Sequence, residues 1–290
     1  MEKKKVPINK DKEKKDKEGG KINRNKNKSK TAMVKNRMLL LNIKYSEYLD
    51  QNPEFCEYME DCLVSVSNFN NETYRHLFCI FDGHGGDFTA KLCVEKYPEI
   101  FRKCLIENPS DYELAIKTSF LLMDKEIEET KKLEVGNTAT VVFINNKLLY
   151  CANVGDSSCC LIGDKAEFIS TEDKCTDKGE MERIEKEGGE IIEGRLGGIL
   201  AVSRGLGDFD LKNKGLIAEP HINKKLIDKS FNYCILASDG VWDALSPDEV
   251  SKLINENNNT DNMAKIIVEK AIEKGSEDNI SCIVIELNKK

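Results

Sequence analysis

An acid, a histidine and three glycines follow a short apolar run near residue 80, and these residue types can hold a metal ion. The run Leu77–Phe81 is short, rich in aromatic residues and bounded by glycine, which favours a buried strand over a helix. Asp82 follows it directly, and the glycines around His84 allow a tight turn. The Asp82 carboxylate and a main-chain carbonyl could then point at one spot, which suits Mg²⁺ or Mn²⁺. The alternative is an ordinary glycine-rich turn with an acid and a histidine on the surface.

Other acids recur beside glycine or a second acid, next to predicted strands. They are Glu60, Asp61, Asp156, Asp239, Asp243, Glu277 and Asp278. A single acid of this kind is more often a turn residue or a helix cap than a ligand. Several of them at strand ends could meet at one edge of a sheet, where carboxylates repel one another unless cations neutralise them. Two metals about 3.5–4 Å apart would then activate a bridging water, and that chemistry hydrolyses phosphate esters.

The elements that must position these acids are mainly strands. Short apolar runs predict seven of them, at Cys62–Val66, Leu77–Phe81, Thr138–Ile144, Leu148–Val154, Cys159–Ile162, Phe231–Ala237 and Ile280–Leu287. Several are joined by short turns such as Asn145-Asn146, which favours antiparallel pairs. Because helices alternate with the strands in blocks, we expect antiparallel sheets flanked by helices.

Three helices carry start or stop signals. The pattern Ser-x-x-Glu at positions 110–113 and 246–249 predicts two helix starts, the second with Pro247 at the first helical position. The expected apolar faces are Leu114, Leu121 and Leu122 in the first helix and Val250, Leu253 and Ile254 in the second. A third helix is expected from Asp261 to about Lys274, with Gly275 as its stop.

Charge divides the chain into two parts. Residues 1–37 hold 15 Lys/Arg and 5 Asp/Glu with almost nothing apolar, so we expect a disordered basic tail of charge +10. Residues 38–290 hold 29 basic and 46 acidic residues, a charge of −17, and are long enough for one large domain. The lysine-rich tail weakly resembles a nuclear-import signal. A nucleic-acid-binding function is not expected, because the body is acidic and has no aromatic-basic motif.

Cysteine usage and hydropathy bear on the compartment. The eleven cysteines form no C-x-x-C pair and lie in apolar runs, which indicates buried thiols in a reducing compartment and argues against a zinc site. The sequence shows no apolar run of membrane-spanning length and no signal-peptide core. We therefore expect a soluble cytoplasmic monomer with no membrane partner, with nuclear entry left open by the tail.

Seven motifs follow one another along the chain. They are Met59-Glu60-Asp61, Phe81-Asp82-Gly83-His84-Gly85-Gly86, Gly136-Asn137-Thr138-Ala139, Gly155-Asp156-Ser157, Leu200-Ala201-Val202-Ser203-Arg204-Gly205-Leu206-Gly207-Asp208, Ala237-Ser238-Asp239-Gly240-Val241-Trp242-Asp243 and Ser276-Glu277-Asp278-Asn279. In this order they resemble the motifs of the metal-dependent serine/threonine phosphatases of the protein phosphatase 2C type. The resemblance extends from about residue 45 to the end of the chain. One motif alone would be moderate evidence, whereas seven in register leave little room for chance.

The resemblance implies an α+β fold, a four-layer α-β-β-α sandwich of two antiparallel sheets flanked by helices, with the metal site at one edge. It implies two Mg²⁺ or Mn²⁺ ions and a weaker third. The implied ligands are Asp82 as the bridge, Glu60, the Gly83 carbonyl and Asp61 through water at one metal, Asp239 and Asp278 at the other, and Asp156 and Asp243 around the third. The implied reaction is hydrolysis of phosphoserine and phosphothreonine in phosphoprotein substrates.

His84 matches the family's proposed general acid. The chemistry agrees, because a serine or threonine alkoxide is a poor leaving group and an imidazolium beside the metals could protonate it. The alternative role for His84 is a structural hydrogen bond within its loop. The other two histidines, His76 and His221, are expected to be structural.

Three departures from the family pattern bear on activity. Residues 172–193 resemble the family's mobile flap, but Glu172-Asp173-Lys174-Cys175 stands where relatives often have Asp-His-Lys-Pro. Ser158 replaces an arginine that often follows Gly-Asp-Ser. Cys56 replaces the arginine that holds the substrate phosphate in many relatives. The intact acids favour an active phosphatase, and Cys56 favours the alternative, a weakly active or inactive homologue that binds phosphoproteins or regulates a partner.

Overall fold

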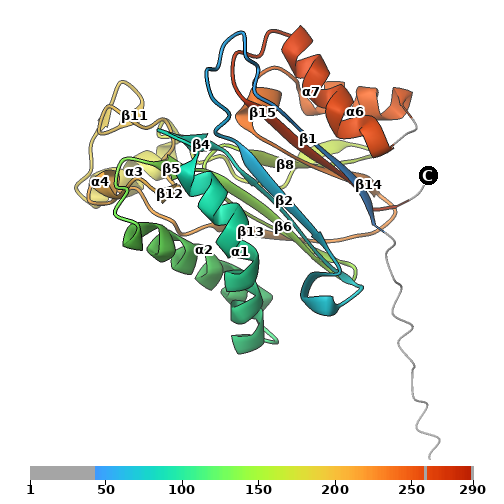
Figure 1. Cartoon of the computed structure of the whole chain (residues 1–290), viewed down its shortest axis with the longest axis horizontal. Coiled ribbons are helices and arrows are strands. Elements are labelled where there is room, and N and C mark those ends of the chain that lie inside the picture. Colours follow the sequence, from blue (N-terminus) through green and yellow to red (C-terminus); the bar gives the residue numbers. More distant parts are fainter. Residues whose placement is uncertain (1–42, 258–259, 289–290) are drawn as a thin grey trace, which may run out of the picture. The chain divides into compact units, whose positions relative to one another are not determined.

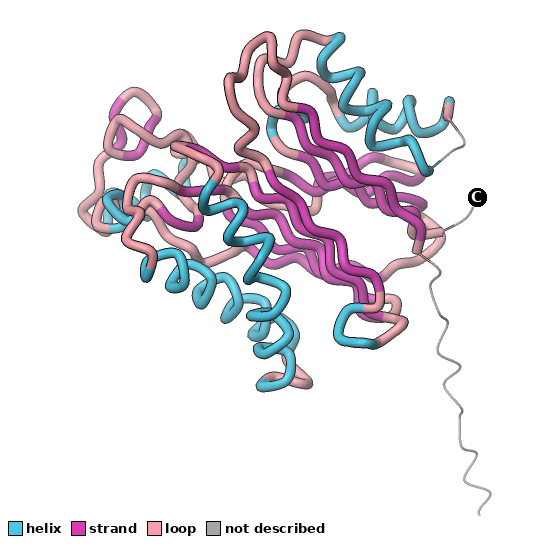
Figure 2. Tube along the Cα trace, in the orientation of Figure 1, coloured by secondary structure: helices cyan, strands magenta, loops and turns pink. Residues whose placement is uncertain are grey.

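Two five-stranded antiparallel sheets face each other, and helices cover their outer surfaces (Figure 1). The computed structural model describes residues 43–257 and 260–288. The predicted tail, residues 1–37, lies outside the described residues. The predicted α+β sandwich is confirmed, and Figure 2 shows its two layers of strands with helices on either side.

The first sheet has the order β13-β7-β6-β3-β2. Its strands are β2 (Cys62–Ser67), β3 (Arg75–Phe81), β6 (Ala139–Asn145), β7 (Leu148–Val154) and β13 (His221–Leu226). The turn between β6 and β7 places Asn146 at φ 58°, a left-handed conformation that asparagine tolerates better than most residues. This sheet delivers Asp82 at the end of β3 and Asp156 just beyond the end of β7.

The second sheet has the order β1-β15-β14-β8-β9. Its strands are β1 (Lys44–Asp50), β8 (Ser158–Gly163), β9 (Ala166–Phe168), β14 (Phe231–Ala237) and β15 (Ile280–Glu286). All seven strands expected from the sequence are therefore present across the two sheets, with ends within two residues of those predicted. Strands β1, β9 and β13 were not predicted.

Helices and small sheets complete the domain. The longer elements are α1 (Phe88–Glu107) and α2 (Tyr112–Glu129) on the first sheet, and α6 (Pro247–Glu256) and α7 (Met263–Glu273) on the second. The shorter ones are α3 (Lys178–Lys186), α4 (Phe209–Lys212), α5 (Asp239–Trp242), β10 (Ile191–Ile192), β11 (Arg195–Leu196), β4 (Gly83–His84), β5 (Gly136–Asn137) and β12 (Leu206–Gly207). The last three strands pair in the order β12-β5-β4.

Strand β3 is buried on both faces, which explains why its sequence is continuously apolar. Leu77, Cys79 and Phe81 point into the cluster under α1 and α2. Phe78 and Ile80 point into the cluster between the two sheets. A strand with two buried faces cannot alternate with polar residues, as a half-exposed strand does. The core therefore fixes the position of Asp82, which follows Phe81.

The start of α2 corrects the sequence expectation. Asp111, not Ser110, caps the helix, and its Oδ1 accepts a hydrogen bond from Leu114 N at 2.9 Å. The expected apolar residues Leu114, Leu121 and Leu122 are exposed. The face that packs on the sheet consists of Ile116, Phe120, Met123 and Ile127. The sequence pattern alone does not tell these neighbouring stripes apart, because both carry apolar residues.

The two C-terminal helices match expectation more closely. Ser246 and Glu249 form the predicted capping box of α6, and Val250 and Ile254 are buried. Helix α7 begins at Met263, two residues later than expected, and the left-handed Gly275 (φ 89°) follows its end.

In the described part of the chain, no helix combines the length and apolarity needed to cross a membrane.

Candidate metal centre

The antiparallel registers bring strand ends and strand starts to the same edge. Phe81 at the end of β3 pairs with Cys62 at the start of β2. Ala237 at the end of β14 pairs with Ser158 at the start of β8 and with Cys282 near the start of β15. Acids just outside these ends are therefore neighbours in space, although they lie far apart in the sequence.

Three of the predicted acids form the centre of this edge. Asp82, Asp156 and Asp239 each offer a carboxylate oxygen, and these oxygens lie within 4.8 Å of one another. Asp82 comes from the first sheet, Asp239 opens α5 directly after the second, and Asp156 lies on the turn that joins them. The Ser157 hydroxyl lies 3.4 Å from Asp82 Oδ2. The site is thus assembled across both sheets.

Burial and mutual repulsion govern the charges of these acids. Burial raises the pKa of Asp82 well above its usual range, and the charges of Asp61, Asp239, Asp156 and Asp278 raise it further. Burial and then the neighbouring carboxylates raise the pKa of Asp239 to about 7. Burial also raises the pKa of Asp61, to about 6. Carboxylates packed this closely lose their protons at neutral pH only at a cost in free energy.

The remaining predicted positions lie around this centre. Asp278 and Asp243 both raise the pKa of Asp239 through their charges, and Asp243 also acts on Asp156. Glu60 is held by its backbone, since its N–H donates to Asn279 Oδ1 at 2.7 Å. Gly83 lies against that backbone, because a Cβ at position 83 would stand 2.6 Å from the Glu60 carbonyl oxygen. The structure therefore brings all eight predicted ligand positions to one edge.

The donor set fits a hard divalent cation. It consists of carboxylate and carbonyl oxygens, which Mg²⁺ and Mn²⁺ prefer. Asp61 Oδ2 is buried and has no hydrogen-bond partner, which leaves a lone pair for a cation or its water. Lys174 lowers the pKa of Asp156 through its charge, but it also forms an ion pair with Glu172 at 3.2 Å. One shared ammonium group cannot balance this many carboxylates.

An open cavity lies beside the acids. Its volume is about 370 Å³, and Asp239, Asp243 and Asp278 line it together with Lys274 and Ser276. A group bound there would have at least three carboxylates of the candidate metal centre on its wall. The site can therefore admit a ligand of substantial size next to the acids.

The glycines around His84 meet two different constraints. Gly85 and Gly86 have φ values of 70° and 127°, which side chains other than glycine rarely adopt, so the predicted tight turn is confirmed there. Gly83 does not have a positive φ, and its constraint is the close approach of Glu60. Together these glycines hold His84 close after Asp82, with its side chain 32% exposed.

His84 has a carboxylate partner that sequence reasoning did not identify. Its Nε2 lies 2.6 Å from Oδ2 of Asp208, whose side chain is 6% exposed. Asp208 belongs to one of the quoted motifs, but no role was inferred for it. A clue in the sequence was the pair Gly207-Asp208, in which an acid stands beside a glycine as it does at Asp82, Asp156 and Asp239.

Cys56 lies beside the acidic edge. Its Sγ is 3.5 Å from the Glu277 carbonyl oxygen. Burial and then the charge of Asp278 raise the pKa of the Cys56 thiol, so the side chain is neutral at physiological pH. A neutral thiol therefore stands at the position where relatives often carry a guanidinium.

Nine of the eleven cysteines are buried and all eleven are free, which confirms the expectation of buried thiols.

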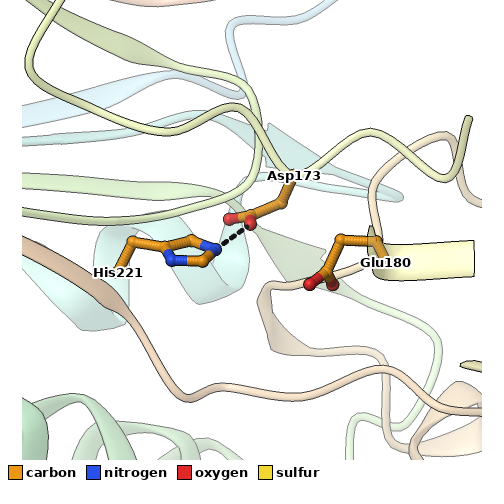
Figure 3. A group of neighbouring side chains, drawn as sticks. All are labelled: Asp173, Glu180 and His221. Atoms are coloured by element: carbon orange, nitrogen blue, oxygen red, sulfur yellow. Dashed lines mark ion pairs between the residues drawn. The ribbon is translucent and has the colours of Figure 1, made fainter. Parts of the chain in front are cut away.

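Two side chains of the flap, residues 172–193, belong to a second group of titratable residues. Asp173, Glu180 and His221 are drawn in Figure 3, where the dashed line joins Nε2 of His221 to Oδ1 of Asp173 at 2.9 Å. Two arginines complete the group. Arg204 contacts Glu180 at 2.7 Å and Asp173 at 3.3 Å, and Arg183 contacts Glu180 at 2.7 Å. Because two arginines and a histidine contact these carboxylates, the group forms an ion-pair network, in which burial still raises the pKa of Asp173.

This network also supports the turn between β7 and β8 that carries Asp156. Asp173 Oδ2 accepts a hydrogen bond from the Gly155 N–H at 2.9 Å, directly before Asp156. The Ser203 hydroxyl donates to Glu180 at 2.7 Å. His221, expected to be structural, is the first residue of β13 and serves this network.

The comparisons with known proteins agree with this geometry. Residues 48–280 match the family model "Protein phosphatase 2C". The chain belongs to the protein phosphatase 2C family. It is 37% identical over 242 residues to "Probable protein phosphatase 2C 69" of Arabidopsis thaliana. The aligned residues make up 80% of this chain and 67% of that protein. It is 32% identical to "Protein phosphatase 2C homolog 1" of Saccharomyces cerevisiae, over 82% of this chain and 91% of that protein.

Solved structures show the same fold. A serine-threonine phosphatase 2C from Toxoplasma gondii superposes with a TM-score of 0.72 at 20% identity, over 85% of this chain and 95% of that one. A C. elegans sex determining protein gives a TM-score of 0.76 at 25% identity, over 85% of this chain and 65% of that one. Membership of the protein phosphatase 2C family supports a phosphatase function, and family members use divalent metals.

Proposed function

We infer that residues 38–290 form the catalytic domain of a metal-dependent phosphatase that hydrolyses phosphoserine and phosphothreonine in proteins. The observation that carries this proposal is the convergence of Asp82, Asp156 and Asp239 within 4.8 Å, from two sheets and the turn between them. Family membership supports the reaction class. The open cavity beside the acids supports access for a phosphoprotein segment.

The proposed ligand roles are those that the family resemblance implies. Asp82 would be a ligand of two divalent ions, Mg²⁺ or Mn²⁺. Glu60, the Gly83 carbonyl and Asp61 through water would serve one, Asp239 and Asp278 would serve the other, and Asp156 and Asp243 would lie around a weaker third. Such ions neutralise phosphate charge and bring the pKa of an attacking water down towards neutrality. The carboxylates hold this charge in place before the substrate arrives, so little reorganisation is needed during the reaction.

His84 supplies the proton in this proposal. When the ester P–O bond breaks, the electron pair stays on the serine or threonine oxygen, which takes a proton from the His84 imidazolium. The partial exposure of the ring, 32%, leaves it reachable by a substrate. It lies two residues after Asp82 in the chain, and its proposed role requires that its ring reach a substrate held by the metals.

One observation favours a second candidate function. Cys56 beside the acidic edge cannot bind phosphate oxygens as a guanidinium does. With that contact missing, the chain could be a weakly active or inactive homologue that binds phosphoproteins or regulates a partner. The complete acid set argues for activity, and so we place this candidate second.

Phosphate release from a phosphothreonine peptide separates the two functions. We expect release with Mn²⁺ or Mg²⁺, loss of release with a chelator, and loss in an Asp82→Asn variant. Fluorescence polarisation with the same labelled peptide measures binding. Metal-dependent binding without release would support the regulatory homologue, and an absence of both would contradict both functions.

A further inference from the structure

The contact between His84 and Asp208 lies outside the proposed metal-ligand set. The two residues are 124 positions apart, and their side chains meet at 2.6 Å. The Asp208 side chain is 6% exposed, so this carboxylate is largely removed from water. A buried carboxylate needs a hydrogen-bond donor, and Nε2 of His84 provides one.

The backbone is arranged to allow this contact. In the small sheet β12-β5-β4, Gly136 pairs with Gly207 on one side and with His84 on the other. A Cβ at Gly136 would stand 1.9 Å from Asp208 Oδ2 and 2.7 Å from His84 Nε2. Only glycine therefore lets the two side chains meet across the middle strand.

Helix capping does not explain Asp208. The residue precedes α4, a position that favours aspartate, but its side chain makes no capping hydrogen bond. Its backbone has φ 48°, a left-handed conformation that costs free energy for a residue with a Cβ. Strain of this kind persists where the surrounding structure fixes a particular side-chain position, here towards the His84 ring.

We propose that Asp208 is a positioning residue that holds His84 by its Nε2–H and so leaves Nδ1 as the nitrogen that protonates the leaving group. This proposal rests on the proposed phosphatase function and on His84 as its acid. As the P–O bond breaks, the proton on Nδ1 passes to the serine or threonine oxygen, and Nε2 keeps its proton towards Asp208. The carboxylate fixes the tautomer and the ring orientation, as partners of functional histidines commonly do.

Leaving-group dependence tests the positioning role. Asp208→Asn keeps the shape of the side chain, but it removes the charge and can present an N–H to Nε2. We expect kcat for a phosphothreonine peptide to fall about 10- to 100-fold, with KM little changed. Turnover of p-nitrophenyl phosphate should fall far less, because its phenolate leaves without much protonation. In a His84→Ala background, Asp208→Asn should cause no further loss with the peptide.

Asp124→Asn is the matched control. Asp124 Oδ1 accepts hydrogen bonds from Gly207 N and from Lys212 Nζ, both at 2.9 Å, so it supports the residue before Asp208 without touching His84. We expect this variant to affect both substrates equally. If Asp208→Asn behaves in the same way, or slows His84→Ala further, Asp208 has a structural role and the proposal is wrong. Partial recovery of peptide turnover by Asp208→Glu would support it.

Histidine NMR tests the contact without activity or metal. The chain has three histidines, so ¹⁵N-histidine spectra at about pH 8 can be assigned with His76→Gln and His221→Gln variants. We expect the neutral His84 ring to be the Nε2–H tautomer. An Nδ1–H tautomer would overturn the proposal even if Asp208→Asn failed to fold.

If the wild type released no phosphate from the peptide, the proposed phosphatase function itself would be wrong, and these spectra would still show whether His84 donates Nε2–H to Asp208. Activity in which His84→Ala showed no leaving-group preference would remove the acid role on which the proposal rests.

Discussion

Replacing Glu180 with glutamine should destabilise the flap network strongly at neutral pH and only weakly in acid. The Glu180 side chain is 10% exposed and contacts Arg183 and Arg204, each at 2.7 Å. Burial alone would raise the pKa of this carboxyl, but hydrogen bonds from Arg204, Arg183 and Ser203 lower it from 4.5 to about 2. Glutamine keeps the size of the side chain and removes the charge that these donors share.

The size of the effect follows from the shift in pKa. At 1.36 kcal/mol per pKa unit, a shift from 4.5 to about 2 corresponds to about 3 kcal/mol in the free energy of unfolding. Because the folded pKa is depressed, this contribution is fully present above the unfolded value of 4.5 and is lost as the pH falls towards 2. It should drop to less than about half by pH 3.

Urea denaturation followed by circular dichroism at several pH values between 7 and 3 measures this difference. Glu182→Gln is the matched control, because Glu182 lies on the same helix with a side chain 69% exposed and a looser contact to Lys178 at 3.8 Å. We expect the control to stay within about 0.5 kcal/mol of wild type. A loss under about 1 kcal/mol for Glu180→Gln at pH 7, or one that persists unchanged at pH 3, would refute the reasoning.

Three further predictions concern the metal centre and Cys56 beside it. Asp82→Ala should abolish Mn²⁺-dependent turnover without lowering the melting temperature of the metal-free protein, and wild-type kcat in the folded variant would contradict the two-metal hypothesis. In thermal scans, Mn²⁺ should raise the melting temperature more at pH 8 than at pH 5. The pKa of Asp239 is raised to about 7, so the metal-free fold is most stable with this acid protonated and loses stability as the pH rises through 7. Cys56→Arg should raise kcat/KM for a phosphopeptide by about 10- to 150-fold, whereas an unchanged or lower value would indicate that another cation such as Lys174 already binds phosphate.

Local sequence patterns predicted most of the sheet framework. All seven expected strands are present because apolar runs such as Leu148–Val154 are buried on both faces and carry a strong signal. Helix α1 was missed, although it is among the longest elements described. It follows the glycine loop with no capping hydrogen bond from Asp87, and Pro98 lies inside it. Its position depends on packing against the first sheet, which local signals do not encode.

Parts of the site were predictable for a different reason. The acids could be found because each stands beside an apolar run, and antiparallel pairing then brings such positions to one edge. The contact between His84 and Asp208 could not be found in this way. It depends on three strands of two residues each and on the absence of a side chain at Gly136. Strands this short have no recognisable periodicity, so only the assembled fold reveals the pair.

The pKa values of Glu180 and Asp239 shift in opposite directions, and this contrast indicates different roles for the ion-pair network around Glu180 and the cluster of acids around Asp239. Glu180 is surrounded by arginine and hydroxyl donors, and its pKa is lowered to about 2. Asp239 is buried among other acids, and burial and then their charges raise its pKa to about 7. The carboxylates of the first group have arginine and histidine partners within the chain, although burial still raises the pKa of Asp173, and they link the flap to the loop of Asp156. The second can keep all its charges at neutral pH only with external cations, which is the condition expected of a metal centre and not of a structural ion-pair network.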